Sequence, residues 1–182
     1  AIDKAGNASS SANTKIRIDK TKPEKPEITN PTGGNWTNSN FKLTLVSSDT
    51  GTVASGISYY QYTYNSNASA TGTDHDNNWV TYSSSAKATY TTTAFSAERN
   101  QKVYVRVCDK AENCSSKNST YIRIDKTKPV IKLSGAVSNT NNGGKATVTY
   151  SDGNWSNIPP TVTISITDTN STTANVYYNV TG

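Results

Sequence analysis

Few residues of this chain could carry covalent, acid–base or redox chemistry. The 182 residues include one histidine, two cysteines and no methionine. His75 lies in an acidic stretch and has no identifiable serine or cysteine partner of the kind that nucleophilic catalysis needs. The sequence shows no glycine-rich phosphate loop and no suggestive pair of carboxylates for glycoside cleavage. We therefore expect no enzymatic activity and no catalytic residue in this segment.

The stretch TGTDHDNNWV (71–80) bears a partial likeness to a calcium-binding loop. Asp74, Asp76 and Asn78 fall at the first, third and fifth positions of an EF-hand loop. Trp79 then stands at the sixth position, where that loop needs glycine, and Ser85 stands at the twelfth, where it needs glutamate. The stretch is better interpreted as a polar turn that precedes a buried tryptophan.

An internal repeat determines how the chain is organised. The string IRIDKTKP occurs at 16–23 and again at 122–129, and residues 3–23 are identical to 109–129 at 15 of 21 positions. A period of about 106 residues is too long for a solenoid and fits a series of independently folding domains. We expect residues 1–20 to be the C-terminal hairpin of a preceding repeat, 21–127 a complete domain, and 128–182 a partial or shorter domain.

The two cysteines are six positions apart, and the repeat bears on their state. The counterparts of Cys108 and Cys114 in the earlier copy are Ile2 and Ala8, so both thiols are missing together. This joint absence favours a disulfide across a hairpin turn over two free buried thiols. A redox or metal site is a further alternative, but one histidine and no third cysteine leave a metal short of ligands. A disulfide implies an oxidising, extracellular compartment.

The composition favours strands over helices. Twenty-three β-branched Ile and Val stand against three Leu, and the chain has 28 Thr. Alternating stretches between turn signals predict seven strands, at 26–29, 41–48, 57–65, 79–82, 87–95, 101–108 and 115–125. In 101–108 the alternation places Val103, Val105 and Val107 inward and Cys108 outward. The sequence thus predicts a disulfide on the surface of an all-β, antiparallel sandwich, with Trp79 in its core.

Several of these stretches together resemble a known family. SGISYYQYTYN (55–65), Trp79, VYVRVCDKAEN (103–113) and IDKTKP (124–129) are similar to strings of the bacterial Ig-like repeats of secreted and cell-surface, adhesin-type proteins. Two departures are Glu112, where those repeats have glycine, and a looser GTVASGI stretch (51–57). The resemblance implies tandem immunoglobulin-like β-sandwiches of about seven strands in an extracellular protein.

The resemblance also implies a candidate cofactor. In related repeats, aspartates at domain junctions bind Ca²⁺, an ion that takes six to eight oxygen ligands. The matching positions recur at both domain ends of this chain: Asp3, Asn7, Asp19, Asp109, Asn113 and Asp125. The alternative is that Asp3 and Asp109 cap turns while Asp19 and Asp125 pair with the lysines that follow them.

The function that we expect is mechanical. Pro23 and Pro129 restrict the chain at the two equivalent junctions, as a stalk or spacer of a cell-surface protein requires. Such a segment would contact neighbouring repeats of its own chain and present an adhesive or other functional domain. The alternatives are an adhesin module that binds a glycan or host protein through Trp36 and Trp155, each in a GNW turn, and an Ig-like decoration of a phage or virion fibre. The same two tryptophans could instead plug the open ends of their sandwiches.

Two other classes of partner are not expected. The net charge of +5 comes from 18 basic and 13 acidic residues without a run of like charge, which does not suggest nucleic-acid binding. No apolar stretch approaches the length of a membrane span.

An incomplete C-terminal sandwich would leave open strand edges, and the hairpin 1–20 of another molecule is one candidate to complete it.

Overall fold

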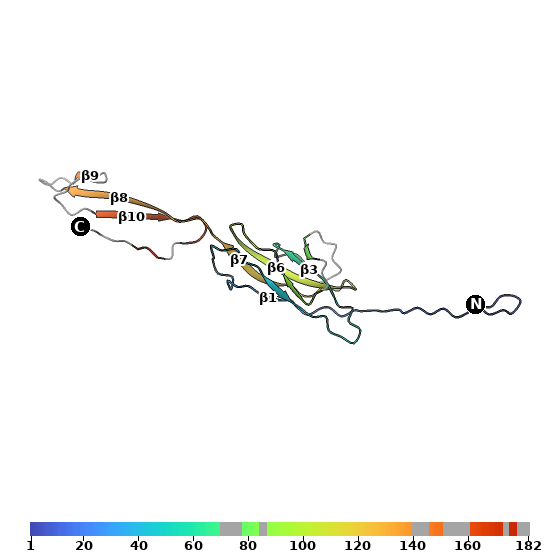
Figure 1. Cartoon of the computed structure of the whole chain (residues 1–182). Coiled ribbons are helices and arrows are strands. Elements are labelled where there is room, and N and C mark those ends of the chain that lie inside the picture. Colours follow the sequence, from blue (N-terminus) through green and yellow to red (C-terminus); the bar gives the residue numbers. More distant parts are fainter. Residues whose placement is uncertain (70–77, 84–86, 140–145, 151–160, 173–174, 178–182) are drawn as a thin grey trace. The chain divides into compact units, whose positions relative to one another are not determined.

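The computed structural model describes residues 1–69, 78–83, 87–139, 146–150, 161–172 and 175–177 (Figure 1). The chain divides into two compact units. The first comprises Ala1–Asn35, Phe41–Phe95 and Gln101–Ile122, and the second comprises Trp36–Asn40, Ser96–Asn100 and Arg123–Gly182. The described part of the chain contains strands and no helix, in line with its high content of β-branched residues. It therefore has no helix of the length and hydrophobicity that a membrane span requires.

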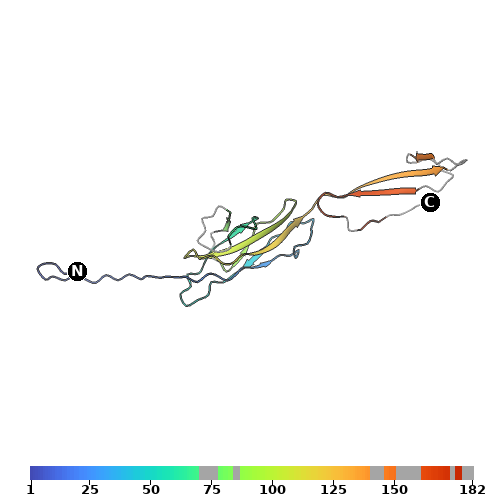
Figure 2. The same cartoon turned by 180° about the vertical axis from the view of Figure 1, so that it is seen from behind.

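The seven strands predicted for residues 21–127 are present and form two antiparallel sheets. Their bounds are β1 (Glu27–Thr29), β2 (Thr44–Val46), β3 (Ile57–Thr63), β4 (Val80–Ser83), β5 (Thr89–Thr91), β6 (Arg99–Asp109) and β7 (Asn118–Ile124). One sheet has the order β1-β2-β5 and the other the order β4-β3-β6-β7. The hairpin of β6 and β7 is visible from both sides in Figures 1 and 2. This pairing is consistent with a β-sandwich.

The main core lies on one face of the four-stranded sheet. In the antiparallel register Tyr60 lies opposite Val107 and Tyr62 opposite Val105, so these four side chains share a face. The Tyr60 ring stacks on Tyr90 of β5 at 5.8 Å between ring centroids, and the Tyr60 hydroxyl donates to the carbonyl of Ala88. The core side chains that are fully buried are Leu43, Leu45, Tyr60, Val103, Val105, Val107, Ile122 and Ile124. Each contributes about 1.5–3 kcal/mol of burial free energy.

The opposite face of the same sheet carries a second buried layer, which the sequence did not predict. Gln61 lies opposite Arg106 and Tyr59 opposite Cys108 in the β3–β6 register. Arg106 is fully buried, and its guanidinium lies 4.4 Å from the centroid of the Trp79 ring. Its Nε and Nη2 both donate to Gln61 Oε1, at 2.9 and 2.8 Å. Trp79 is buried as expected, but over Arg106, on the face opposite the valines.

Residues 1–20 contain the counterpart of β7 without the rest of its domain. Ile2 pairs with Ala8 in an isolated antiparallel bridge, and the residues that follow form no strand. Ile16 and Ile18 are 81% and 64% exposed, whereas their counterparts Ile122 and Ile124 are fully buried in β7. The same residues are thus apolar core in one copy and exposed in the other.

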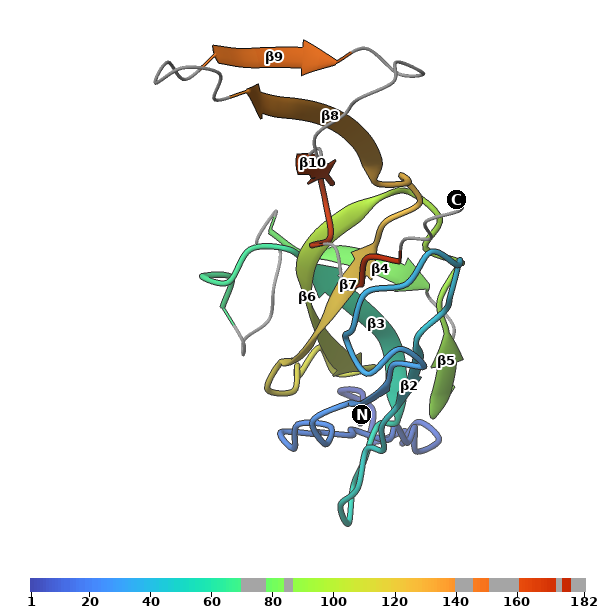
Figure 3. The ribbon, with the colours of Figure 1, turned by 90° about the vertical axis from the view of Figure 1, so that its left-hand side faces the viewer.

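The C-terminal part contains a third antiparallel sheet. It is formed by β8 (Val130–Asn139), β9 (Ala146–Tyr150) and β10 (Thr161–Thr167) in the order β10-β8-β9 (Figure 3). Strand β9 lies within KATVTYSD (145–152), which is similar to FKLTLVSSD (41–49), and β10 lies within TVTISITD (161–168). The described residues 175–177 form no strand.

Candidate functional site

Cys108 and Cys114 form the predicted disulfide. The bond closes the turn 109–113 between β6 and β7, and the two cysteines also form an isolated antiparallel bridge. The alternation of β6 places Cys108 on the outer face, as expected, but the two cysteines are only 0% and 1% exposed. The expectation of a surface disulfide is therefore wrong. Cys108 lies on the same face of β6 as the buried Arg106, and its Sγ lies 3.8 Å from Oε1 of Gln61, the hydrogen-bond partner of Arg106.

The turn between the cysteines is built around one carboxylate. Asp109 Oδ1 accepts hydrogen bonds from the backbone N–H groups of Ala111 and Asn113, both at 2.8 Å. Asp109 Oδ2 accepts from Asn113 Nδ2 at 2.8 Å. The earlier copy repeats this pattern at Asp3, which accepts from the N–H groups of Ala5 and Asn7 and from Asn7 Nδ2. Because that copy has no cysteines, the aspartate and the asparagine are sufficient to define the turn.

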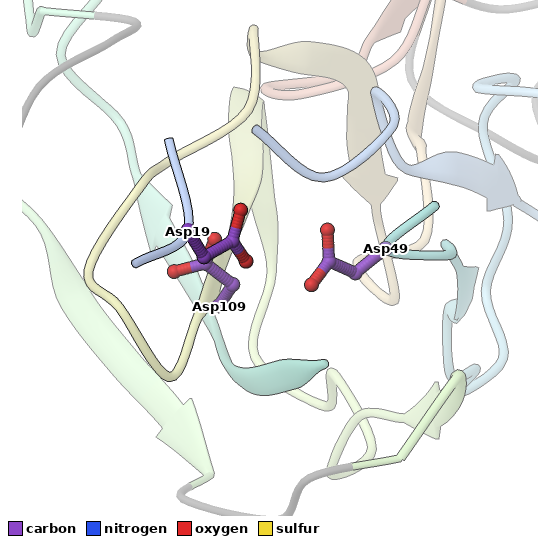
Figure 4. A group of neighbouring side chains, drawn as sticks. All are labelled: Asp19, Asp49 and Asp109. Atoms are coloured by element: carbon purple, nitrogen blue, oxygen red, sulfur yellow. The ribbon is translucent and has the colours of Figure 1, made fainter. Parts of the chain in front are cut away.

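Asp109 belongs to a cluster of three carboxylates (Figure 4). Oxygen atoms of Asp19, Asp49 and Asp109 all lie within 4.8 Å of one another. Asp109 ends β6, Asp49 follows β2, and Asp19 follows the string IRI at 16–18. Asn113 is adjacent, since its Nδ2 also lies 3.2 Å from the Asp19 carbonyl oxygen. Carboxylate, amide and carbonyl oxygens are the ligands that Ca²⁺ prefers.

The three carboxylates differ in how their charge is compensated. Burial raises the pKa of Asp49, the N–H of Gly56 opposes that shift, and the negative charges of Asp19 and Asp109 add to it. Asp49 Oδ1 is buried and has no hydrogen-bond partner among the described residues. Hydrogen bonds from the N–H groups of Thr21 and Ser55 lower the pKa of Asp19. The cluster thus concentrates negative charge around one carboxylate oxygen that has no donor.

The structure brings together only part of the predicted set of calcium ligands. Asp19, Asp109 and Asn113 are neighbours, whereas Asp3 and Asn7 form their own turn at the start of the chain. Asp49, which completes the cluster, was not among the predicted ligands. A signal for it was available, because Asp49 directly follows the predicted strand 41–48, and FKLTLVSSD (41–49) and KATVTYSD (145–152) both end in an aspartate.

Asp125, the remaining predicted ligand, lies in the second unit and repeats the hydrogen bonds of Asp19. Asp19 Oδ1 accepts from Thr21 N at 2.9 Å, and Asp125 Oδ1 accepts from Thr127 N at 2.9 Å. Asp19 Oδ2 accepts from Ser55 N at 2.6 Å, and Asp125 Oδ2 accepts from Ser171 N at 2.8 Å. Among the described residues, neither aspartate forms an ion pair with the lysine that follows it. Each carboxylate therefore ties the segment that leaves the repeated IRI string, called the exit segment here (19–21 and 125–127), to a more distant loop. That loop precedes β3 for Asp19 and follows β10 for Asp125.

A second set of hydrogen bonds holds the exit segment 125–127. Lys126 Nζ donates to Asn40 Oδ1 and to the carbonyl of Ser96, both at 2.7 Å. Glu98 Oε1 accepts from Lys126 N and from Thr127 Oγ1, at 2.9 and 2.8 Å, and Glu98 Oε2 accepts from Asn170 Nδ2 at 3.3 Å. The segment is therefore hydrogen-bonded both to residues that precede it in the chain and, through Glu98, to the neighbourhood of Asn170.

Trp36 is half-buried beside the same junction. Together with Thr37, Asn38, Asp125 and Ser171 it lines a hollow of about 190 Å³. Trp36 is therefore neither fully buried, as a plug would be, nor fully exposed, as a binding residue would be.

Several other residues singled out in the sequence lie outside the described residues: Trp155, His75, Asp74, Asp76 and Ser85. Asn78 is described, and its Oδ1 accepts from Asn65 Nδ2 at 3.2 Å.

Comparison with known proteins identifies no relative. No protein-family model matches the chain, and no curated protein or solved structure matches it significantly.

Proposed function

We propose that this chain is a structural stalk segment of an extracellular bacterial surface protein, built from tandem Ig-like β-sandwiches. In this proposal residues 21–127 form one sandwich, and the segment has no catalytic role. Sheets of three and four strands in about 105 residues support the Ig-like assignment. The disulfide supports an oxidising compartment outside the cell.

The observation that carries the proposal is the repetition of one junction sequence together with its aspartate turn. Both junctions contain the sequence IRIDKTKP, and in both the aspartate accepts from a threonine N–H two residues later and from a serine N–H further along the chain, Ser55 before β3 or Ser171 after β10. In this proposal a repeated junction gives similar angles between successive domains. A stalk with a defined reach requires this property, whereas an independent binding module does not.

The proposal includes a calcium ion at the carboxylate cluster. Asp19, Asp49 and Asp109 would be its ligands, with the neighbouring Asn113 in support. Asp19 comes from the exit segment and Asp49 and Asp109 from the domain that follows, so an ion bound to all three would stiffen the junction. Asp49 Oδ1, which is buried and lacks a donor among the described residues, is the atom that would gain most from a cation. A rise in melting temperature in millimolar Ca²⁺ over excess chelator tests this part of the proposal.

The adhesin alternative rests on Trp36. Its hollow offers an aromatic ring and polar groups, which is the chemistry of a glycan contact. Asp125 donates its N–H to the carbonyl of Thr37 and accepts from the N–H groups of Thr127 and Ser171, which favours a role in the junction. Because Trp36 lines the same hollow as Asp125, we assign it to the same role. Binding of a glycan that is lost in Trp36→Ala, with an unchanged melting temperature, would support the adhesin alternative instead.

The stiffness of the second junction can be measured directly. Spin labels at the exposed positions Lys87→Cys and Thr163→Cys would report the distance between the domain and the C-terminal sheet, because the native disulfide is too buried to react. We expect a narrow distance distribution that broadens in Asp125→Ala. A distribution that is already broad in the unsubstituted junction would contradict the stalk.

A further inference from the structure

The first junction contains a hollow that no residue of the described chain fills. It has a volume of about 700 Å³ and lies at Asp19 and Ser55, the two residues whose hydrogen bond ties the exit segment to the following loop. The other residues that line it are Arg17, Gly51, Thr52, Val53, Ala54, Lys110 and Ala111. Its walls therefore belong to the exit segment, the loop after β2 and the turn after β6.

The second junction shows what lies beside the counterpart of Asp19. Asp125 is that counterpart, and its Oδ2 accepts from Ser171 N as Asp19 Oδ2 accepts from Ser55 N, although Ser55 precedes β3 and Ser171 follows β10. Asp125 and Ser171 line a hollow with Trp36, Thr37 and Asn38. That hollow measures about 190 Å³. A Trp-Thr-Asn turn thus lies beside the aspartate of the second junction.

The backbone explains how the turn reaches this place. Thr37 forms a parallel bridge with Ile124; its N–H donates to the carbonyl of Arg123 at 3.2 Å, and its carbonyl accepts from Asp125 N at 3.0 Å. The counterparts of Arg123 and Asp125 at the first junction are Arg17 and Asp19. The carbonyl of Arg17 and the N–H of Asp19 have no main-chain partner among the described residues.

The lysine of the exit segment shows the same contrast. Lys126 Nζ donates to Asn40 and Ser96, as described above. Its counterpart Lys20 is exposed, and its ammonium has no hydrogen-bond partner in the described part of the chain. The backbone sites at Arg17 and Asp19 and the side chain of Lys20 therefore lack the partners that a copy of residues 36–40 and 96–100 would supply.

We infer that the hollow at Asp19 and Ser55 is a socket for the Trp-Thr-Asn turn of a preceding copy of this repeat. The turn would pair through its threonine with Arg17 and Asp19 and place its tryptophan in the hollow. This inference rests on the proposed tandem arrangement and names the residues that form the joint. A tryptophan side chain buries about 150–250 Å² on insertion, so the joint would gain apolar burial beside its hydrogen bonds.

A tandem chain tests the socket. The period allows a second copy of residues 21–126 to replace residues 1–20 directly before Thr21. The two copies would give identical peptides, so the second copy carries Thr50→Ser at an exposed position. A peptide that contains residue 50 and the loop 51–55 then differs in mass between the two copies. We expect amide hydrogen exchange in the loop of the second copy to be slower by about tenfold or more than in the 182-residue chain.

The matched variants place Trp36→Ala in one copy at a time. In the first copy the substitution should abolish the protection, and Trp36→Phe should retain part of it. In the second copy the same substitution should leave the protection unchanged, which controls for general destabilisation. Equal exchange in the tandem and the 182-residue chain, or protection that survives Trp36→Ala in the first copy, would overturn the socket.

Two further readouts separate the possible failures. Small-angle scattering of the same tandem reports whether the repeats form a rod. A rod with an unprotected loop would overturn the socket and leave the stalk proposal standing, whereas a flexible tandem would overturn the stalk. The hollow also carries Arg17 and Lys110, so protection of the loop in the 182-residue chain by inorganic phosphate would favour an anionic ligand over the socket.

Discussion

Glu112 offers a quantitative test of how the turn that carries Asp109 is built. Its φ is 67°, in the left-handed region, and it is the one described residue other than glycine with a positive φ. The counterpart in the earlier copy is Gly6, with a φ of 90°. The turn therefore imposes a backbone conformation that glycine adopts freely and that costs other residues about 1–2 kcal/mol.

We predict that Glu112→Gly stabilises the domain. The relief of about 1–2 kcal/mol is partly offset by the greater chain entropy of glycine in the unfolded state, about 0.5–1 kcal/mol. The net gain is about 1 kcal/mol, which for a domain of about 100 residues raises the melting temperature by about 5 °C. Thermal unfolding followed by calorimetry measures this directly.

Glu112→Ala is the matched control. It removes the same charge and side chain but keeps the β-carbon, so we expect no comparable stabilisation. An equal gain in both variants would mean that the charge of Glu112 is the cause. A loss of stability in Glu112→Gly would refute the account of the turn.

Three more predictions follow from the buried groups. Asp49→Asn should raise the melting temperature in chelator and abolish any rise with Ca²⁺: because folding raises the pKa of Asp49, its ionisation costs stability as the pH rises through that value. A melting temperature in chelator that is lower in Asp49→Asn at neutral pH would contradict this. Cys108→Ile combined with Cys114→Ala, the residues of the earlier copy, should leave a folded domain that is less stable by about 2 kcal/mol in denaturant titration, and failure to fold would show that the turn depends on the disulfide. Arg106→Ala should cost about 3 kcal/mol or more, because it opens a cavity under Trp79 and leaves Gln61 Oε1 without its donors; a cost below about 1 kcal/mol would show that the outer layer contributes little.

The strands could be predicted because strand periodicity is a local signal. The alternation around Val103, Val105 and Val107 identifies β6 and its inner face from eight consecutive residues. The disulfide could also be predicted, because the repeat shows that Cys108 and Cys114 are replaced together. In both cases the information lies within one hairpin or in the comparison of two copies.

The features that were missed depend on contacts between distant parts of the chain. Arg106 lies at a polar position in the alternation of β6, which predicts an exposed residue. The side chains that bury it are those of Gln61 and Trp79, which lie 45 and 27 positions earlier and give no local signal. Asp49 joins Asp19 and Asp109 from 30 and 60 positions away for the same reason. Alternation distinguishes the two faces of a strand, but it does not show whether the outer face is covered.

The most direct test of the stalk is the dependence of length on repeat number. Chains with one, two and three copies of residues 21–126 inserted before Thr21 can be compared by small-angle X-ray scattering. Fixed, identical junctions predict that the maximum dimension increases by an equal increment with each added copy. An increase that follows roughly the square root of the copy number, as for freely jointed domains, would contradict the account.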